Sequence, residues 1–135
     1  MSIQLSETIA NRLVVEQIIW LTTVRAGSVP TPTPVWFLWD GETFVIFTQP
    51  GSQKLRNIAQ NPTVALNFNT DEWGGSVAVF TGTAEVENKL PSAQMDAYLM
   101  KYAEGIKMIG MTPERMAAEY STFIRITPSR VRTLE

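Results

Sequence analysis

The chain has 135 residues, a formal net charge of −2 and neither cysteine nor histidine. This length suffices for one domain with its own core. The missing residue types exclude disulfides, Cys/His zinc sites, thiolate chemistry and histidine-activated nucleophiles, and the weakly acidic balance argues against nucleic acid as a general partner. Because no pair of carboxylates is spaced for acid–base work, an enzyme of this composition would depend on a cofactor.

The N-terminal third predicts a helix followed by a first strand. Ser6 is a plausible N-cap for a helix that runs to about Val15, with Ile9 and Leu13 on its inward stripe. Residues 17–25 are rich in β-branched and aromatic side chains, and the Ala-Gly-Ser triplet that follows predicts a turn into a second strand.

Neither a membrane span nor a secretory signal is expected. The longest apolar run, Val35–Trp39, is far too short to cross a bilayer. The first residues lack a basic region followed by an apolar stretch and a small-residue cleavage site, so we expect a cytoplasmic protein.

The segment from residue 30 to residue 48 predicts two strands with unusual features. Prolines at positions 30, 32 and 34 remove every other backbone N–H, which places this stretch at a sheet edge or a loop mouth. In Val35–Trp39 both alternating faces are apolar, so this strand should be buried on two sides. Asp40-Gly41 then predicts a hairpin turn into a strand at Thr43–Thr48.

A short helix, Ser52–Gln60, carries cations where acidic residues are usually favoured. Lys54 and Arg56 lie in its first turn, close to free N–H groups and the positive end of the helix dipole. Either both cations point into solvent, or a bound phosphate resolves the conflict. The two residues point about 200° apart on a helix, so they cannot both face one phosphate, and Lys54 is the better candidate.

The rest of the chain predicts three more strands and two more helices. Gly82 indicates a bulge or a bend at a barrel corner. The methionines near the C-terminal helices indicate adaptable packing, or alternatively the lining of a substrate pocket. The expected segments are strands at 63–69 and 76–86, helices at 91–102 and from Thr112 onward, and a bent final strand, 122–134, broken by Pro128.

These elements predict a single domain, mainly β with α+β character. About six antiparallel strands with hairpin turns and a few flanking helices are typical of a small Greek-key or split β-barrel. The chain has no glycine-rich phosphate-binding motif, and its strands do not alternate with helices, which disfavours a parallel nucleotide-binding sheet.

Four segments resemble the pyridoxamine 5′-phosphate oxidase-like superfamily of FMN-binding split-barrel proteins, and most closely its branch of probable users of the deazaflavin F420. They are WLTTVR, TPVWFLWDGETFVIFTQPGSQKLRNIAQNPTVAL, GTAEVE and YAEGIKMIGMTPERMAAEYSTFIRITPSRVR, which together cover nearly the whole chain. The resemblance implies a homodimer with cofactor sites in clefts between the subunits. One face of Val35–Trp39 could then fill the barrel while the other meets the partner.

The same resemblance implies a set of cofactor-binding residues. The Thr-Pro-Val-Trp step would contact the flavin-like ring, and the strand-to-helix segment would bind ribityl and phosphate groups. For single residues a structural role remains open: Trp36 as core only, Thr48 as a strand former and Asn57 as helix surface. The implied residues are Thr33, Pro34, Val35, Trp36, Thr48, Gln49, Ser52, Lys54 and Asn57.

Two functions follow as hypotheses. The first is an oxidoreductase in which F420 or FMN passes a hydride to a small conjugated or quinone-like substrate, with Tyr98, Tyr102 or solvent as proton donor. The alternative is a non-catalytic module that holds FMN or another planar anion. Vitamin B6 oxidation is not expected, because the chain lacks the oxidase's arginine- and histidine-rich substrate site and its longer C-terminal segment. No catalytic side chain and no metal site are expected.

Overall fold

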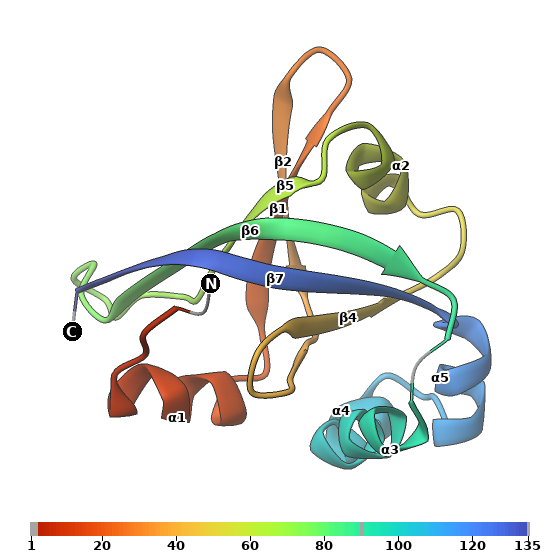
Figure 1. Ribbon diagram of the computed structural model, residues 1–135. Coiled ribbons are helices and arrows are strands. Elements are labelled where there is room, and N and C mark those ends of the chain that lie inside the picture. The colour runs from red at the N-terminus through yellow and green to blue at the C-terminus, as the bar shows by residue number, and fades with distance from the viewer. Residues whose placement is uncertain (1–2, 90, 135) are drawn as a thin grey trace.

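The computed structural model describes residues 3–89 and 91–134, which form one curled antiparallel sheet flanked by helices (Figure 1). The strands lie in the order β2-β1-β5-β6-β7-β4-β3. The elements are α1 (Glu7–Val15), β1 (Ile19–Arg25), β2 (Val29–Val35), β3 (Leu38–Trp39), β4 (Phe44–Thr48), α2 (Gln53–Gln60), β5 (Thr63–Asn67), β6 (Val77–Glu87), α3 (Ser92–Lys101), α4 (Ala103–Met108), α5 (Pro113–Glu119) and β7 (Thr122–Leu134).

The predicted fold class is confirmed, with seven strands instead of six. Every strand pair is antiparallel. The β1–β2 hairpin projects from the sheet beside α2, while α3, α4 and α5 gather beyond the end of β4 (Figure 1). None of the described helices combines the length and apolar character needed to cross a membrane.

The interior consists of two apolar clusters, one on each side of β4. The first lies inside the curled sheet and includes Ile9 and Leu13 of α1 and Ile58 of α2. The second lies between the sheet and α3–α5. All five residues of β4 are buried, because Phe44 and Ile46 face the first cluster while Val45 and Phe47 face the second.

The packing of residues 35–39 explains why both faces of this segment are apolar. Val35 and Phe37 belong to the first cluster, whereas Trp36 and Leu38 pack against the second. The prediction of one continuous strand is wrong, because β2 ends at Val35 and β3 begins at Leu38. Helices of the same chain cover the second face, so burial of this segment on two sides needs no partner subunit.

The proline-rich strand β2 lies at one edge of the sheet, as predicted. Its prolines stand opposite Trp20, Thr22 and Val24 of β1. Since proline has no N–H, the ladder to β1 must run through the alternate residues of β2, and the prolines direct their carbonyl oxygens away from the sheet. The prolines of this edge therefore offer acceptors without donors, which disfavours the addition of another strand.

The long strands β6 and β7 are joined across the predicted bulge. Gly82 stands opposite Pro128 and Thr81 opposite Arg130, so one residue of β7 is extra at this point. A Cβ on Gly82 would lie 2.9 Å from the Pro128 Cα, which leaves no room for a side chain. Pro128 thus bends β7 without ending it, contrary to the predicted break.

Candidate functional site

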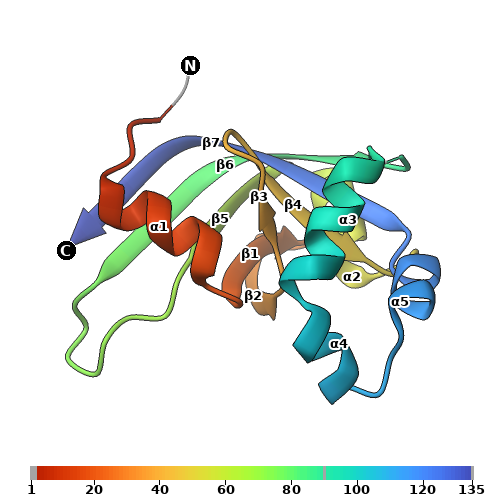
Figure 2. The same ribbon diagram turned by 90° about the horizontal axis from the view of Figure 1, so that it is seen from below.

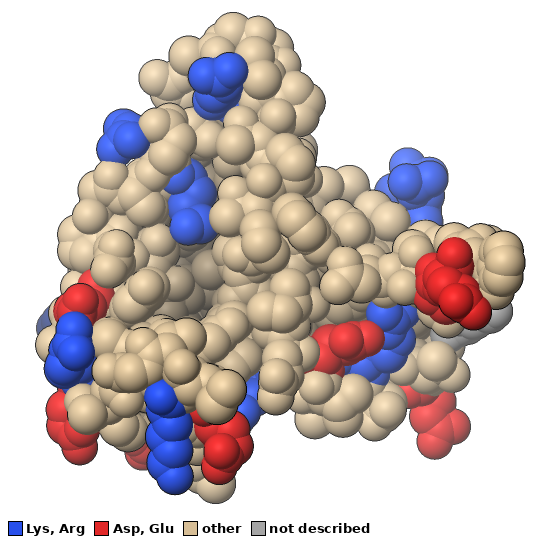
Figure 3. Space-filling view, turned by 180° about the vertical axis from the view of Figure 1, so that it is seen from behind, with Lys and Arg blue, Asp and Glu red and all other residues tan. Residues whose placement is uncertain are grey.

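A cavity of about 300 Å³ opens between α2, the strand ends and the C-terminal helices. In the view from behind, the molecule is hollowed between the part that carries α2 and the helices α3–α5, with basic side chains on the α2 side (Figure 3). Apolar and aromatic side chains form most of the wall. The lining residues are Ile18, Pro34, Val35, Trp36, Phe47, Thr48, Lys54, Tyr98, Ile109, Met116 and Tyr120.

Lys54 supplies the positive charge of this cavity. Its side chain is half-buried, and burial lowers the pKa of its ammonium group. No carboxylate of residues 3–89 or 91–134 lies within ion-pair distance of it, and the first turn of α2 has no acidic residue. A half-buried ammonium without a counter-ion is favourable only if an anion or water completes its surroundings.

Arg56 is excluded from the cavity by its own hydrogen bonds. It donates to the Gly51 carbonyl at 2.6 Å and to the Gln53 side chain at 2.7 Å, both at the start of the same helix. The guanidinium group is thereby folded back along α2. The structure confirms that Lys54 and Arg56 do not share one side of the helix.

The start of α2 is also partly open to a ligand. Ser52 is the N-cap residue, but its hydroxyl group makes no capping bond; it accepts a hydrogen bond of 3.0 Å from the Thr48 hydroxyl instead. The Ser52 side chain therefore does not cap α2. Thr48 and Ser52 join the end of β4 to the start of α2.

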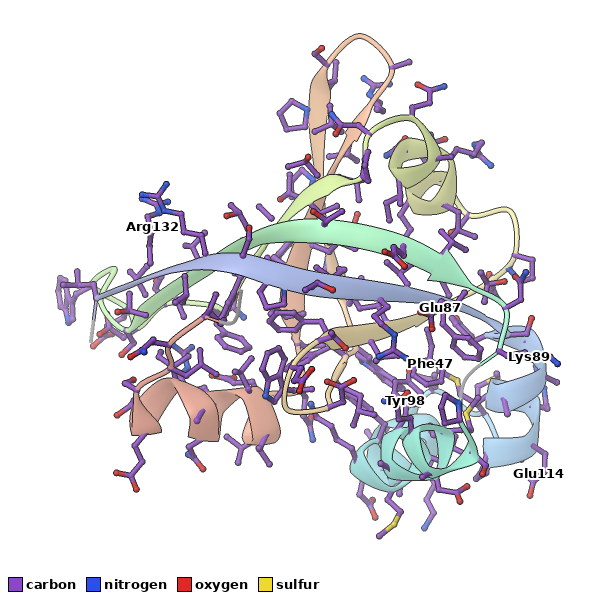
Figure 4. All side chains as sticks on the ribbon, in the orientation of Figure 1. Phe47, Glu87, Lys89, Tyr98, Glu114 and Arg132 are labelled. Carbon is purple, nitrogen blue, oxygen red and sulfur yellow. The ribbon has the colours of Figure 1, made fainter. Side chains whose placement is uncertain are left out.

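Stacked aromatic rings form the opposite wall. Phe47 of β4 and Tyr98 of α3 are stacked with centroids 3.8 Å apart, and Figure 4 shows them pointing toward one another. Trp36 lies parallel to Tyr102 at 4.5 Å. Gly105 of α4 leaves room for the Trp36 ring, since a Cβ there would lie 3.1 Å from it and the ring would have to shift.

The two tyrosines named as proton donors differ in position. Tyr98 lines the cavity, and burial raises the pKa of its phenol group. Tyr102 lies behind Trp36, where its hydroxyl donates to the Gln17 carbonyl at 2.7 Å and accepts from the Phe37 N–H at 2.9 Å. Tyr102 thus fixes the backbone beneath the cavity and lies outside its lining.

Five residues of the predicted cofactor set come together in the lining, namely Pro34, Val35, Trp36, Thr48 and Lys54. Thr33 and Gln49 lie next to lining residues in the chain, and Ser52 accepts a hydrogen bond from the lining residue Thr48, but none of the three belongs to the wall. Asn57 is buried, which overturns its interpretation as helix surface, and it holds α2 against β1 through a 2.9 Å hydrogen bond to Thr23. The cofactor-binding roles of these nine residues stay predictions.

Sequence reasoning did not place five other lining residues at a ligand site: Ile18, Phe47, Ile109, Met116 and Tyr120. Only Met116 had a signal, as a member of the methionine group that could line a pocket. The other four come from strand and helix ends whose meeting point depends on the tertiary fold.

The family model described as pyridoxamine 5′-phosphate oxidase matches residues 5–135. The chain belongs to this family. The predicted resemblance to the split-barrel superfamily is therefore confirmed. No curated protein matches the chain.

Several solved structures share the fold of this family member. An F420 reductase has 24% identity and a TM-score of 0.75, with 95% of this chain and 98% of that chain covered. An FAD-binding protein from Mesorhizobium loti has 19% identity and a TM-score of 0.67, with 94% and 90% covered. A heme storage protein from Vibrio cholerae has 16% identity and a TM-score of 0.69, with 98% and 96% covered. At these identities the likeness shows the fold alone.

Proposed function

We propose that the cavity beside α2 binds FMN or F420 and that the protein is an oxidoreductase acting on a small conjugated or quinone-like substrate. One observation carries the proposal: Lys54, a half-buried cation without a carboxylate partner among the described residues, lines the same cavity as flat aromatic and apolar surfaces. The family and the F420 reductase among the structural neighbours support it.

The lining fits a ring at one end and an anion at the other. Pro34, Val35 and Trp36 present backbone and an indole, and the Phe47–Tyr98 pair adds further aromatic surface. The volume is at the lower end for small-molecule sites, so the ring system would fill it and the phosphate group would extend toward Lys54 and the N-terminus of α2.

When bound, such a cofactor supplies hydride chemistry, and the chain supplies position and environment. Apolar walls exclude water, while Lys54 fixes the anionic end. Within residues 3–89 and 91–134, no carboxylate lines the cavity. A proton for the reduced substrate would therefore come from solvent or from the hydroxyl group of Tyr98 or Tyr120.

The second candidate is a split-barrel module that holds FMN or another planar anion without turnover. The same lack of an acidic group in the lining favours it. A heme storage protein also shares the fold. Histidine-ligated heme is excluded here, because the sequence contains no histidine.

Titration and turnover together test the proposal. Purified protein is examined by absorbance and mass spectrometry for bound cofactor, then titrated with FMN and with F420. We expect saturable binding of one of them. The protein, the reduced cofactor and menadione are then mixed without oxygen. A hydride from the cofactor and a proton from solvent convert the quinone to the hydroquinone. The absorbance of the oxidised cofactor returns as this reaction proceeds. Binding without turnover supports the module, and binding of neither cofactor overturns the oxidoreductase and the FMN-holding form of the module.

We also propose a homodimer in which the second copy covers the open side of the cavity. Ile109 lines the cavity and yet is 55% exposed, so an apolar part of the wall faces outward in the single chain. A cleft shared between two subunits is also what the resemblance to the superfamily implies.

A further inference from the structure

A second cavity, separate from the first, lies between α1 and α3 over β3. Figure 2 shows α1 and α3 on either side of β3. The cavity measures about 470 Å³ and shares no lining residue with the first. It is lined by Leu13 and Val14 of α1, Leu38 and Trp39 of β3, and Ala97, Met100 and Lys101 of α3.

Among the described residues of this lining, Lys101 alone carries a charge. Its ammonium group donates to the Phe37 carbonyl at 3.0 Å and lies 3.8 Å from the centre of the Phe37 ring. A surface lysine usually extends its ammonium group into water along an apolar stem. Here the group is turned inward, where a hydrogen bond and a ring face hold it in one place.

The charge of Lys101 is only partly compensated. Among residues 3–89 and 91–134, no carboxylate lies within ion-pair distance of its nitrogen. A carbonyl oxygen and an aromatic face stabilise an ammonium group less than a carboxylate does. Burial accordingly lowers the pKa of Lys101 to about 8. The more distant carboxylate of Glu16 acts in the opposite direction and raises this pKa.

We propose that this cavity, defined by its seven lining residues, binds a small monocarboxylic acid with an apolar body. The carboxylate pairs with the Lys101 ammonium, and the apolar part lies along Leu13, Trp39 and Met100. A phosphate ester or a dicarboxylate fits poorly, because among the described lining residues only Lys101 and Trp39 have side-chain donors. The site does not depend on the cofactor proposed for the first cavity.

Octanoate is the probe, measured by calorimetry on the full-length protein at pH 7. We expect saturable binding with one site per chain. Lys101→Met keeps the length and apolar packing of the stem, and it should weaken octanoate binding by at least about tenfold, the effect of losing a charge-assisted hydrogen bond. Octanol, which has the same tail without the charge, should bind more weakly than octanoate and respond little to this variant.

A pair of exposed valines gives a matched control that does not alter the half-buried Lys101. Val14 lines the cavity and is 65% exposed, whereas its neighbour Val15 lies outside the lining and is 60% exposed. Val14→Asp places a negative charge beside the bound carboxylate and should weaken octanoate binding, while Val15→Asp should leave it unchanged.

Three results would overturn the proposal: no octanoate binding at millimolar concentration, equal binding by the wild type and Lys101→Met, or equal effects of the two valine variants. A dimer in solution that hides Val14 and excludes octanoate would also overturn it, and would assign the groove to a second copy of the chain. Cofactor titration of the same variants separates this site from the first, since the proposed cofactor affinity should not change in Val14→Asp.

Discussion

Lys54 is the residue on which the proposed cofactor site depends most directly. Its ammonium group is half-buried in the cavity, and burial lowers its pKa, so a bound phosphate should restore favourable surroundings. We expect Lys54→Ala to weaken the binding free energy of the preferred cofactor by about 1.5–3 kcal/mol, the range for a hydrogen bond to a charged group. Fluorescence or calorimetric titration measures this change, and the stability of the fold should hardly alter.

Arg56→Ala is the matched control, because it removes the same charge from the same helix. Its guanidinium group bonds to Gly51 and Gln53 and does not line the cavity. Cofactor affinity should therefore change little. If Lys54→Ala and Arg56→Ala lower cofactor affinity equally, the loss comes from the change in overall charge, and Lys54 does not contact the cofactor.

Lys101 should titrate with a pKa of about 8 in the folded protein. Its pKa in the unfolded chain is near 10.4. Between these values the native state binds fewer protons than the unfolded state, so the contribution of this residue to stability rises as pH increases from about 8 to 10.5. Carbon-13 NMR of the four lysines, with Lys101→Met for assignment, gives the pKa directly. A value near 10.4 would show that the ammonium is solvated in solution.

Single residues were predictable from sequence where local chemistry decides their position. Lys54 was identified because a cation in the first turn of a helix conflicts with the helix dipole, a fact readable from spacing alone. Asn57 was not, because its burial depends on Thr23, a residue 34 positions away on β1. Tyr102 likewise was treated as a proton donor, since nothing in the sequence reveals its bonds to Gln17 and Phe37.

At the scale of elements, the contribution of the β6–β7 contact to stability can be tested at Gly82, where the two strands approach closely. A Cβ at Gly82 would collide with the backbone of Thr127 and Pro128, neither of which can move without disturbing the bulge. We expect Gly82→Ala to lower the free energy of unfolding by about 1–3 kcal/mol, the usual cost of overpacking. Urea denaturation measures this loss.

Thr83→Ala, at an exposed position of the same strand, provides the comparison and should change stability by no more than about 0.5 kcal/mol. A Gly82→Ala variant as stable as Thr83→Ala would mean that the bulge relaxes at no cost and does not fix the register of the two strands.

Most elements were predictable because caps, turns and prolines are local signals. The Ser6 hydroxyl accepts from the Ile9 N–H at 3.2 Å, and that of Thr112 accepts from the Arg115 N–H at 3.1 Å, as helix N-caps should. The interruption after Val35 was missed because the apolar alternation continues through it, while the Phe37 N–H bonds to the distant Tyr102 hydroxyl instead of to a neighbouring strand. The short helix α4 was missed because it takes its place from buried Ile106 and from Gly105 against Trp36, both tertiary contacts.

At the scale of the whole molecule, the chain's own packing decides which residues can test the proposed homodimer. Trp36 and Leu38 pack against the second apolar cluster of their own chain. A charged residue at position 36 should therefore unfold the protein rather than release folded monomers. Ile109 is the better probe, because it lines the first cavity and remains largely exposed.

If a second copy closes the first cavity over Ile109, cofactor binding and dimerisation are linked. The protein should sediment as a dimer at micromolar concentration, cofactor should strengthen the dimer, and cofactor affinity should fall on dilution below the dimer dissociation constant. Ile109→Asp should weaken both processes, whereas Val15→Asp, with a similarly exposed valine outside the cavity, should weaken neither. Sedimentation velocity with and without cofactor measures the two together. A well-folded monomer that binds cofactor with an affinity independent of protein concentration would show that one chain forms the whole site, and the closing wall would then have to come from the aromatic and methionine side chains of α3–α5 alone.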